Sequence, residues 1–143
     1  MSGFLGRYDF QMDEKGRVSL PAAFRKEAGG ERFILLQWEK PYLTLFPEEV
    51  WKGVQERLLE YRRADPSAWT YVREITANAV EVSPDKQGRI LIPAWLQAAA
   101  SLQGTVVLNG VIDRVEIWDP EEYQKAIPEE AEDSRRFRYQ IFR

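Results

Sequence analysis

The sequence predicts an α+β fold in which two copies of one strand-rich unit are joined by a helical connector. An internal repeat is the first observation. Residues 13–24 (DEKGRVSLPAAF) and residues 85–96 (DKQGRILIPAWL) match at an offset of 72, with five identical positions. The second observation is the pattern of hydrophobic residues. Alternation typical of half-buried strands recurs in both copies, and the residues between the copies have apolar side chains at helical spacing.

The first copy is expected to contain two hairpins and a short helix. Residues 8–12 alternate apolar and polar side chains as a strand, and residues 17–20 alternate again as the returning strand of a hairpin. Between them, residues 13–16 have turn chemistry, because the aspartate can accept backbone N–H groups and the glycine can adopt a positive φ. A proline suits the start of a helix over 21–28, and a second hairpin follows over 33–46.

The second copy repeats this order, and two helices are expected between the copies. Its first hairpin is expected over 80–92, its helix from Pro93 to a point before Gly104, and its second hairpin over 106–118. Apolar stripes at helical spacing mark the connector helices: Val50, Val54, Leu58 and Tyr61 in the first, and Trp69, Val72, Ile75 and Ala79 in the second. We interpret both stripes as core.

Composition excludes several classes of chemistry. The 143 residues include no cysteine and no histidine, so a cysteine nucleophile, a Cys/His zinc site and a Ser-His relay are ruled out. The adjacent acids Glu48-Glu49 and Glu121-Glu122 fall in first helical turns, where they compensate the helix dipole, and we do not interpret them as catalytic pairs. We therefore expect neither an enzyme nor a cofactor or metal.

No secretion signal or membrane segment is visible, because no apolar run approaches the ~20 residues that span a bilayer. We expect a cytoplasmic protein with no membrane partner. Charge constrains its partners further, since 20 Lys+Arg against 23 Asp+Glu leave a net charge of −3 and a pI near 5.2. A nucleic-acid binder is usually basic, so a DNA interpretation requires the basic residues to be concentrated on one face.

Two Asp-x-x-x-Arg motifs, 13–17 and 85–89, are each followed by Pro-Ala, and with these features the chain resembles the MraZ family. That family consists of bacterial transcriptional regulators with two tandem SpoVT-AbrB modules. The resemblance covers residues 4–124 and implies swapped-hairpin β-barrel modules that pair as a pseudo-dimer. It also implies homo-oligomeric rings that bind repeated DNA sites upstream of the division and cell-wall gene cluster, their own operon included, and hence association with the nucleoid.

On this basis we divide the chain into four parts: module 1 (7–50), a helical connector (51–78), module 2 (79–122) and a C-terminal tail (123–143). The tail is charge-segregated, with four acids over residues 129–133 ahead of four arginines over residues 135–143. We expect it to be frayed alone and ordered against a partner.

The resemblance also implies which residues contact DNA. Carried over position by position, they are Asp13, Lys15, Arg17, Asp85, Lys86 and Arg89, with Arg7 as an addition. A structural interpretation stays open beside this one, because an Asp and an Arg four residues apart can simply pair and hold the hairpin. An exposed turn lysine such as Lys15 can likewise be merely solvated. A different class of function also remains, namely a ring-forming scaffold or an antitoxin-like module that binds protein without specific DNA regulation.

Overall fold

The computed structural model describes residues 3–127 and 133–142, and it has the predicted mixed α+β composition. Its strands are β1 (Arg7–Gln11), β2 (Arg17–Ser19), β3 (Phe33–Leu36), β4 (Leu43–Pro47), β5 (Val80–Val82), β6 (Arg89–Leu91), β7 (Thr105–Gly110) and β8 (Val115–Trp118). Its helices are α1 (Ala22–Ala28), α2 (Glu48–Ala64), the 3-10 helix η1 (Pro66–Ala68), α3 (Trp69–Asn78), α4 (Ala94–Ala99), α5 (Pro120–Ala126) and α6 (Ser134–Ile141).

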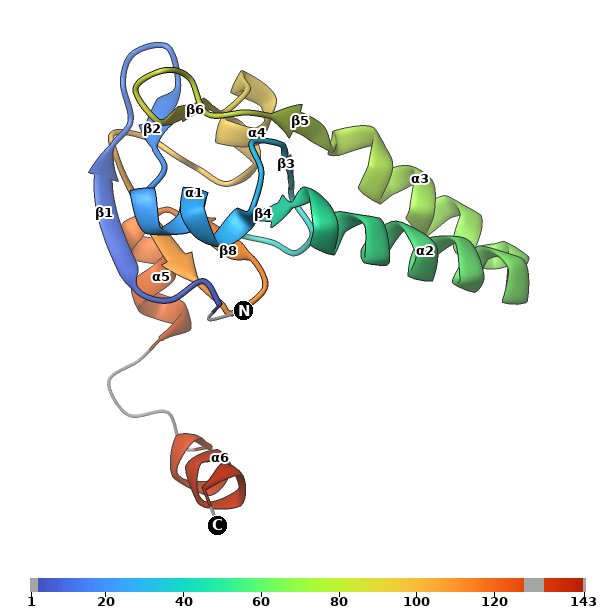
Figure 1. The fold of residues 1–143 in the computed structure, drawn as a ribbon. Coiled ribbons are helices and arrows are strands. Elements are labelled where there is room, and N and C mark those ends of the chain that lie inside the picture. The colour runs from blue at the N-terminus through green and yellow to red at the C-terminus, as the bar shows by residue number, and fades with distance from the viewer. Residues whose placement is uncertain (1–2, 128–132, 143) are drawn as a thin grey trace.

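The strands of the two repeats interleave. Six of them form an antiparallel sheet in the order β1-β7-β8-β4-β3-β5, and β2 and β6 form a separate two-stranded sheet (Figure 1). The first hairpin expected in each copy, over residues 8–20 and over residues 80–92, is wrong. β1 pairs with β7 and β5 pairs with β3, while β2 and β6 pair with each other. Alternation determines which face of a strand is buried but not which strand lies beside it.

The pairings relate the repeats by an approximate twofold rotation. At the centre of the β2–β6 pair, Val18 faces Ile90, and in the β4–β8 pair Thr44 faces Glu116. Each of these residues faces its own counterpart at the offset of 72. As a result, the first strand of each repeat flanks the second hairpin of the other, and the two motif loops lie at the same end of the molecule (Figure 1).

One large hydrophobic core is shared by both repeats. Most of its members come from the strands, from α1 and α4 and from the segments next to them, including the fully buried Phe24, Leu35, Leu96 and Ile117. Phe24 and Leu96 occupy equivalent positions of the two repeats, so both short helices insert an apolar side chain into the same interior. Burial of these apolar side chains is the main force that holds the interleaved strands together.

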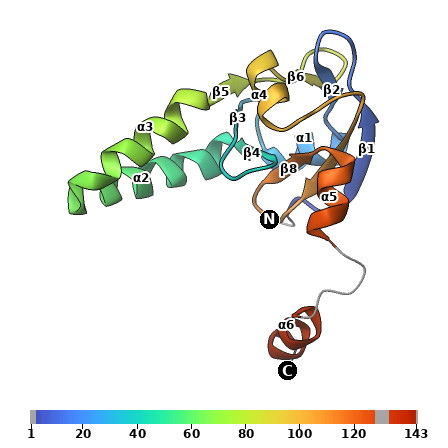
Figure 2. The same ribbon diagram turned by 180° about the vertical axis from the view of Figure 1, so that it is seen from behind.

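The connector forms a helical arm that projects from the sheets. Figures 1 and 2 show α2 and α3 lying side by side and extending away from the strands. Val54, Leu58 and Ile75 are buried in a second apolar cluster. Two residues of the expected stripes are solvent-exposed instead, Tyr61 (70%) and Trp69 (39%). They lie near the tip of the arm, beyond the residues of the second apolar cluster.

The C-terminal part of the chain contains α5 and α6. Tyr123 of α5 packs on Val107 and Trp118, whereas α6 lies apart from the strands in both views. Residues 129–132 of the acidic segment and the terminal Arg143 lie outside the described residues, so the expectation for the tail falls partly outside them. Of the helices in the described ranges, none is long and apolar enough to cross a membrane.

Candidate nucleic-acid interface

The first motif loop is closed by the side chain of Asp13. Its Oδ1 accepts the backbone N–H groups of Lys15 (2.9 Å) and Arg17 (2.8 Å). The main-chain carbonyl of Asp13 accepts the N–H of Gly16 (3.0 Å), and Gly16 has a φ of 88°, which glycine adopts without strain. The hydrogen bonds to its carboxylate hold the pKa of Asp13 below its usual range, and the bond from the Arg17 backbone N–H contributes most.

The second motif loop has the same construction. Oδ1 of Asp85 accepts the backbone N–H groups of Gln87 (2.9 Å) and Arg89 (3.0 Å), and Gly88 has a φ of 77°. The hydrogen bond from the Arg89 backbone N–H contributes most to holding the pKa of Asp85 below its usual range. The predicted turn chemistry is confirmed at both positions.

Each loop is tied to the other repeat through its glycine. The carbonyl of Gly88 accepts the N–H of Leu20 (2.8 Å), and the carbonyl of Gly16 accepts the N–H of Ile92 (2.9 Å). These reciprocal bonds extend the β2–β6 pairing at both ends. The two loops and the two strands therefore form one continuous unit, which we call the motif ribbon (residues 13–20 and 85–92).

The motif ribbon presents two arginines on one face. Val18 and Ile90 point inward and are buried, so their neighbours point to the opposite face because side chains alternate along a strand. The outward residues are Arg17, Ser19, Arg89 and Leu91. Since Arg17 faces Leu91 and Ser19 faces Arg89, the two arginines lie diagonally across the outer face.

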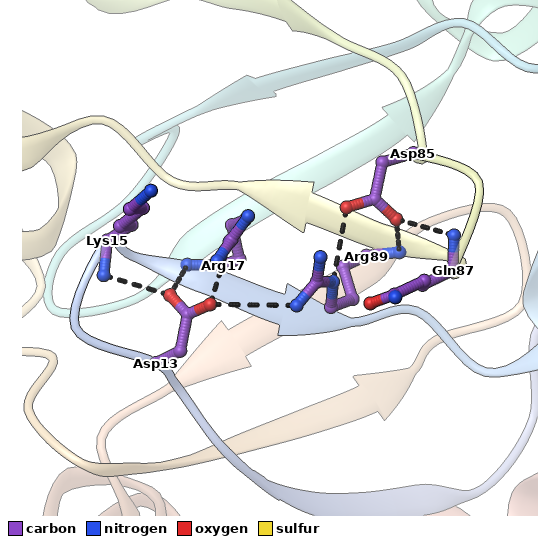
Figure 3. Close-up of polar contacts among 6 residues, drawn as sticks. All are labelled: Asp13, Lys15, Arg17, Asp85, Gln87 and Arg89. Atoms are coloured by element: carbon purple, nitrogen blue, oxygen red, sulfur yellow. Dashed lines mark hydrogen bonds and ion pairs between the residues drawn. The ribbon is translucent and has the colours of Figure 1, made fainter.

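Both arginines are oriented by the loop carboxylates. Nε of Arg17 donates to Oδ2 of Asp13 (2.7 Å), and Nε of Arg89 donates to Oδ2 of Asp85 (3.1 Å). Arg89 also approaches Asp13, with Nη1 3.8 Å from Oδ2, so it links the two loops (Figure 3). The arginine side chains keep 34% and 28% of their surface exposed. Within the described residues, the Nη groups of Arg17 make no hydrogen bond and remain available as donors.

The other predicted contact residues divide into two groups. Lys15 and Lys86 are exposed on the loops, beside the arginines. Arg7 lies at the far end of β1 from the first loop, where it pairs with Asp9 (2.9 Å and 3.1 Å). Its Cζ is 4.7 Å from the ring centroid of Tyr123. The structure thus brings six of the seven residues together on the motif ribbon and leaves Arg7 apart.

Two further polar side chains reach the motif ribbon, and sequence reasoning missed both. Nε of Arg25 on α1 donates to the carbonyl of Leu20 (3.2 Å), and Nε2 of Gln97 on α4 donates to the carbonyl of Ile92 (2.7 Å). The available signal was their equivalence at the offset of 72. Nothing local in the sequence indicated that they would reach the loops.

The described residues contain no group of three His, Cys, Asp or Glu side chains that could hold a metal ion. What the motif ribbon offers is a set of oriented hydrogen-bond donors with positive charge. Guanidinium groups held through Nε by a carboxylate can direct their remaining N–H groups at phosphate oxygens or base edges.

Comparison with known proteins identifies the family. The model described as "MraZ protein, putative antitoxin-like" matches residues 4–73 and again residues 75–138. The chain belongs to the MraZ family. The two matches confirm both the predicted family and the predicted duplication, and each match contains one motif loop.

Several MraZ relatives are similar along most of their length, and each carries the name "Transcriptional regulator MraZ". The relative from Carboxydothermus hydrogenoformans is 42% identical over 118 residues, which cover 82% of each chain. The relative from Desulfitobacterium hafniense is 44% identical over 115 residues, covering 80% of each. The MraZ relative from Thermomicrobium roseum is 38% identical over 120 residues, covering 84% of each.

Proposed function

We propose that this chain is a sequence-specific DNA-binding transcriptional regulator and that the motif ribbon is its contact surface. The observation that carries the proposal is the diagonal placement of Arg17 and Arg89 on one partly exposed face, each oriented by a loop carboxylate. The names of the MraZ relatives support it.

The motif ribbon is a two-stranded element of a kind that enters a DNA groove. The major groove of B-DNA is ~12 Å wide and admits a two-stranded β-ribbon. In such a complex the Nη groups of Arg17 and Arg89 would reach guanine edges or phosphates, while Lys15 and Lys86 would contact phosphates. Asp13 and Asp85 would act by holding the arginines. Arg7 stays a prediction, and its distance from the ribbon favours contact with a different stretch of DNA.

We further propose that modules 7–50 and 79–122 pair as a swapped-hairpin pseudo-dimer, and that chains assemble into a closed ring. The ring would bind repeated DNA sites upstream of the division and cell-wall gene cluster, which includes the protein's own operon. This binding would place the protein on the nucleoid. The exchanged strands support the pseudo-dimer. The net charge of −3 supports assembly, because one chain alone would neutralise few phosphates and avidity multiplies weak contacts.

The test is fluorescence anisotropy with the full-length assembled protein across a salt series. A fragment from upstream of its own coding sequence is compared with a shuffled fragment, and we expect specific binding to be at least about 10³-fold tighter. Arg17→Ala should weaken binding to the upstream fragment by about 1–3 kcal/mol. The matched control is Arg63→Ala, which removes an exposed arginine from the far end of α2.

Equal and weak binding to both fragments would contradict specific regulation at that site and would favour the scaffold or antitoxin-like function. Equal losses in Arg17→Ala and Arg63→Ala, with both variants folded and assembled, would show that only net charge matters. A monomer that binds one site tightly at physiological salt would contradict the need for assembly.

A further inference from the structure

Arg25 and Gln97 occupy equivalent positions but differ in charge. Both lie one turn into the short helix that follows the motif ribbon, and both donate a hydrogen bond to the last carbonyl of their own strand segment, that of Leu20 or Ile92. The shared bond shows that the backbone places the two side chains alike. The two positions therefore differ only in the side chain that they present to a ligand, a charged guanidinium at Arg25 and a neutral amide at Gln97.

Each of these side chains lies against the loop of the opposite repeat. A Cβ added to Gly88 would lie 2.9 Å from Cζ and 3.1 Å from Nη2 of Arg25. A Cβ added to Gly16 would meet the amide of Gln97 in the same way. The Arg25 guanidinium therefore occupies the space beside Gly88 that a side chain at this position would fill. Through this exchange, a residue of the first repeat becomes part of the second loop.

The exchange makes the two ends of the motif ribbon unequal in charge. The first end has two bases, Lys15 and Arg17, against two acids, Asp13 and Glu14. The second end has three bases, Lys86, Arg89 and the contributed Arg25, against the single acid Asp85. The two ends therefore differ by two units of net charge, and Arg25 contributes half of that difference.

Arg25 is well suited to bind an anion at this point. It is exposed, and among the described residues it forms no ion pair within 4.0 Å. Its Nε is engaged by the carbonyl of Leu20, which orients the planar group without neutralising it. The Nη groups are the donors that bind phosphate oxygens in the two-pronged geometry that lysine cannot provide.

We propose that Arg25 is a DNA-contact residue that binds a backbone phosphate beside the second loop, so that the two ends of the motif ribbon bind DNA unequally. The inference rests on the proposed function. If Arg25 binds a phosphate, the second end of the motif ribbon binds the DNA backbone more strongly than the first end. A single chain then prefers one orientation on DNA.

Two reciprocal substitutions test this proposal, because each of the equivalent positions 25 and 97 can be given the residue that the other repeat has there. Arg25→Gln makes the second end resemble the first and can keep the bond to Leu20, as Gln97 does to Ile92. Gln97→Arg makes the first end resemble the second. The readout is the slope of log affinity against log salt on the upstream fragment, which changes by about 0.9 for each phosphate contact to B-DNA.

We expect Arg25→Gln to reduce the magnitude of this slope by about one for each chain in contact with DNA, and Gln97→Arg to increase it by a similar amount. Circular dichroism and the oligomeric state should match the wild type in both variants. The ratio of specific to shuffled binding should change little, since phosphate contacts carry no sequence information directly.

An unchanged slope in Arg25→Gln, with Arg17→Ala still impaired, would overturn this inference and leave the proposed function standing. A lower melting temperature with an unchanged slope would assign Arg25 a purely structural role and overturn it too. If the wild type itself fails to distinguish the upstream fragment, the proposed function fails first, and this inference fails with it.

Discussion

At the scale of single residues, Asp13 and Asp85 have two roles that the sequence left as alternatives. Each carboxylate holds its loop through two backbone N–H groups and also holds an arginine through Nε. The structural interpretation and the functional one therefore apply together. An exposed Asp–Arg pair contributes little to stability by itself, and the backbone hydrogen bonds matter more for the loop.

The lowered pKa values of Asp13 and Asp85 predict an acid-sensitive contribution to folding. A carboxyl whose pKa is lower in the folded state stabilises the fold above its unfolded pKa of ~3.9, and this contribution is lost as the pH falls through the folded pKa. We expect the double variant Asp13→Asn/Asp85→Asn to melt below the wild type at pH 5–8. The gap should close toward pH 3, as measured by thermal melts.

Glu60→Gln is the control for this experiment, because Glu60 is an exposed carboxylate on α2. Its melting temperature should follow that of the wild type at every pH. A gap between the double variant and the wild type that stayed constant down to pH 3 would contradict the assignment. With no histidine in the chain, no side chain of ordinary pKa titrates between pH 5.5 and 8.

At the scale of elements, the motif ribbon depends on close approach at its glycines. Gly16 and Gly88 of the motif ribbon, and Gly29 outside it, all have a positive φ but differ in what a Cβ would meet. At Gly16 it would lie 2.8 Å from the carbonyl oxygen of Ile92, which belongs to the backbone and cannot move alone. At Gly88 it would meet the end of the flexible Arg25, and at Gly29 it would meet nothing within 4 Å.

This comparison predicts an order of destabilisation for three alanine substitutions. In each variant, an alanine with a positive φ lowers the free energy of unfolding by about 1–2 kcal/mol. Gly16→Ala should lower it further because the new Cβ also displaces the Ile92 carbonyl. Gly88→Ala should be intermediate and should move Arg25 away from the second loop. Urea denaturation measures the order, and a cost for Gly16→Ala no larger than that for Gly29→Ala would contradict it.

At the scale of the whole molecule, neither repeat has a complete sheet of its own. β1 of the first repeat completes the sheet beside β7, and β5 of the second completes it beside β3. Because both repeats also share one core, removing either would expose the other's apolar interior. We therefore expect the two repeats to fold as one cooperative unit.

This interleaving predicts a single unfolding transition for the two repeats. Far-ultraviolet circular dichroism and tryptophan fluorescence should give coincident denaturation curves, as expected for a two-state system. Tryptophans report on both repeats and on the arm: Trp38 in the first repeat, Trp51 and Trp69 in the arm, and Trp95 and Trp118 in the second repeat. Two resolved transitions, or a chain truncated after residue 78 that folds as a monomer, would contradict it.

The local parts of the candidate site could be predicted from sequence, and the long-range parts could not. The loops, the helix after Pro21 and the second hairpins depend on contacts between residues close together in the chain, and they lie where the patterns predict. Helical spacing also placed Val54 and Leu58 in the core of the arm. It failed at Tyr61, because spacing identifies one side of a helix but not where the covering layer ends.

The sequence alone determined the duplication, the family and the turn chemistry of both Asp-x-x-x-Arg loops, since these depend on residue identity within a few positions. Only the tertiary structure decided which strands pair, that Arg89 approaches Asp13, and that Arg25 lies against Gly88. The physical reason is the range of the forces involved. Strand partners and contacts between repeats are selected by burial of the whole shared core, which no local pattern encodes.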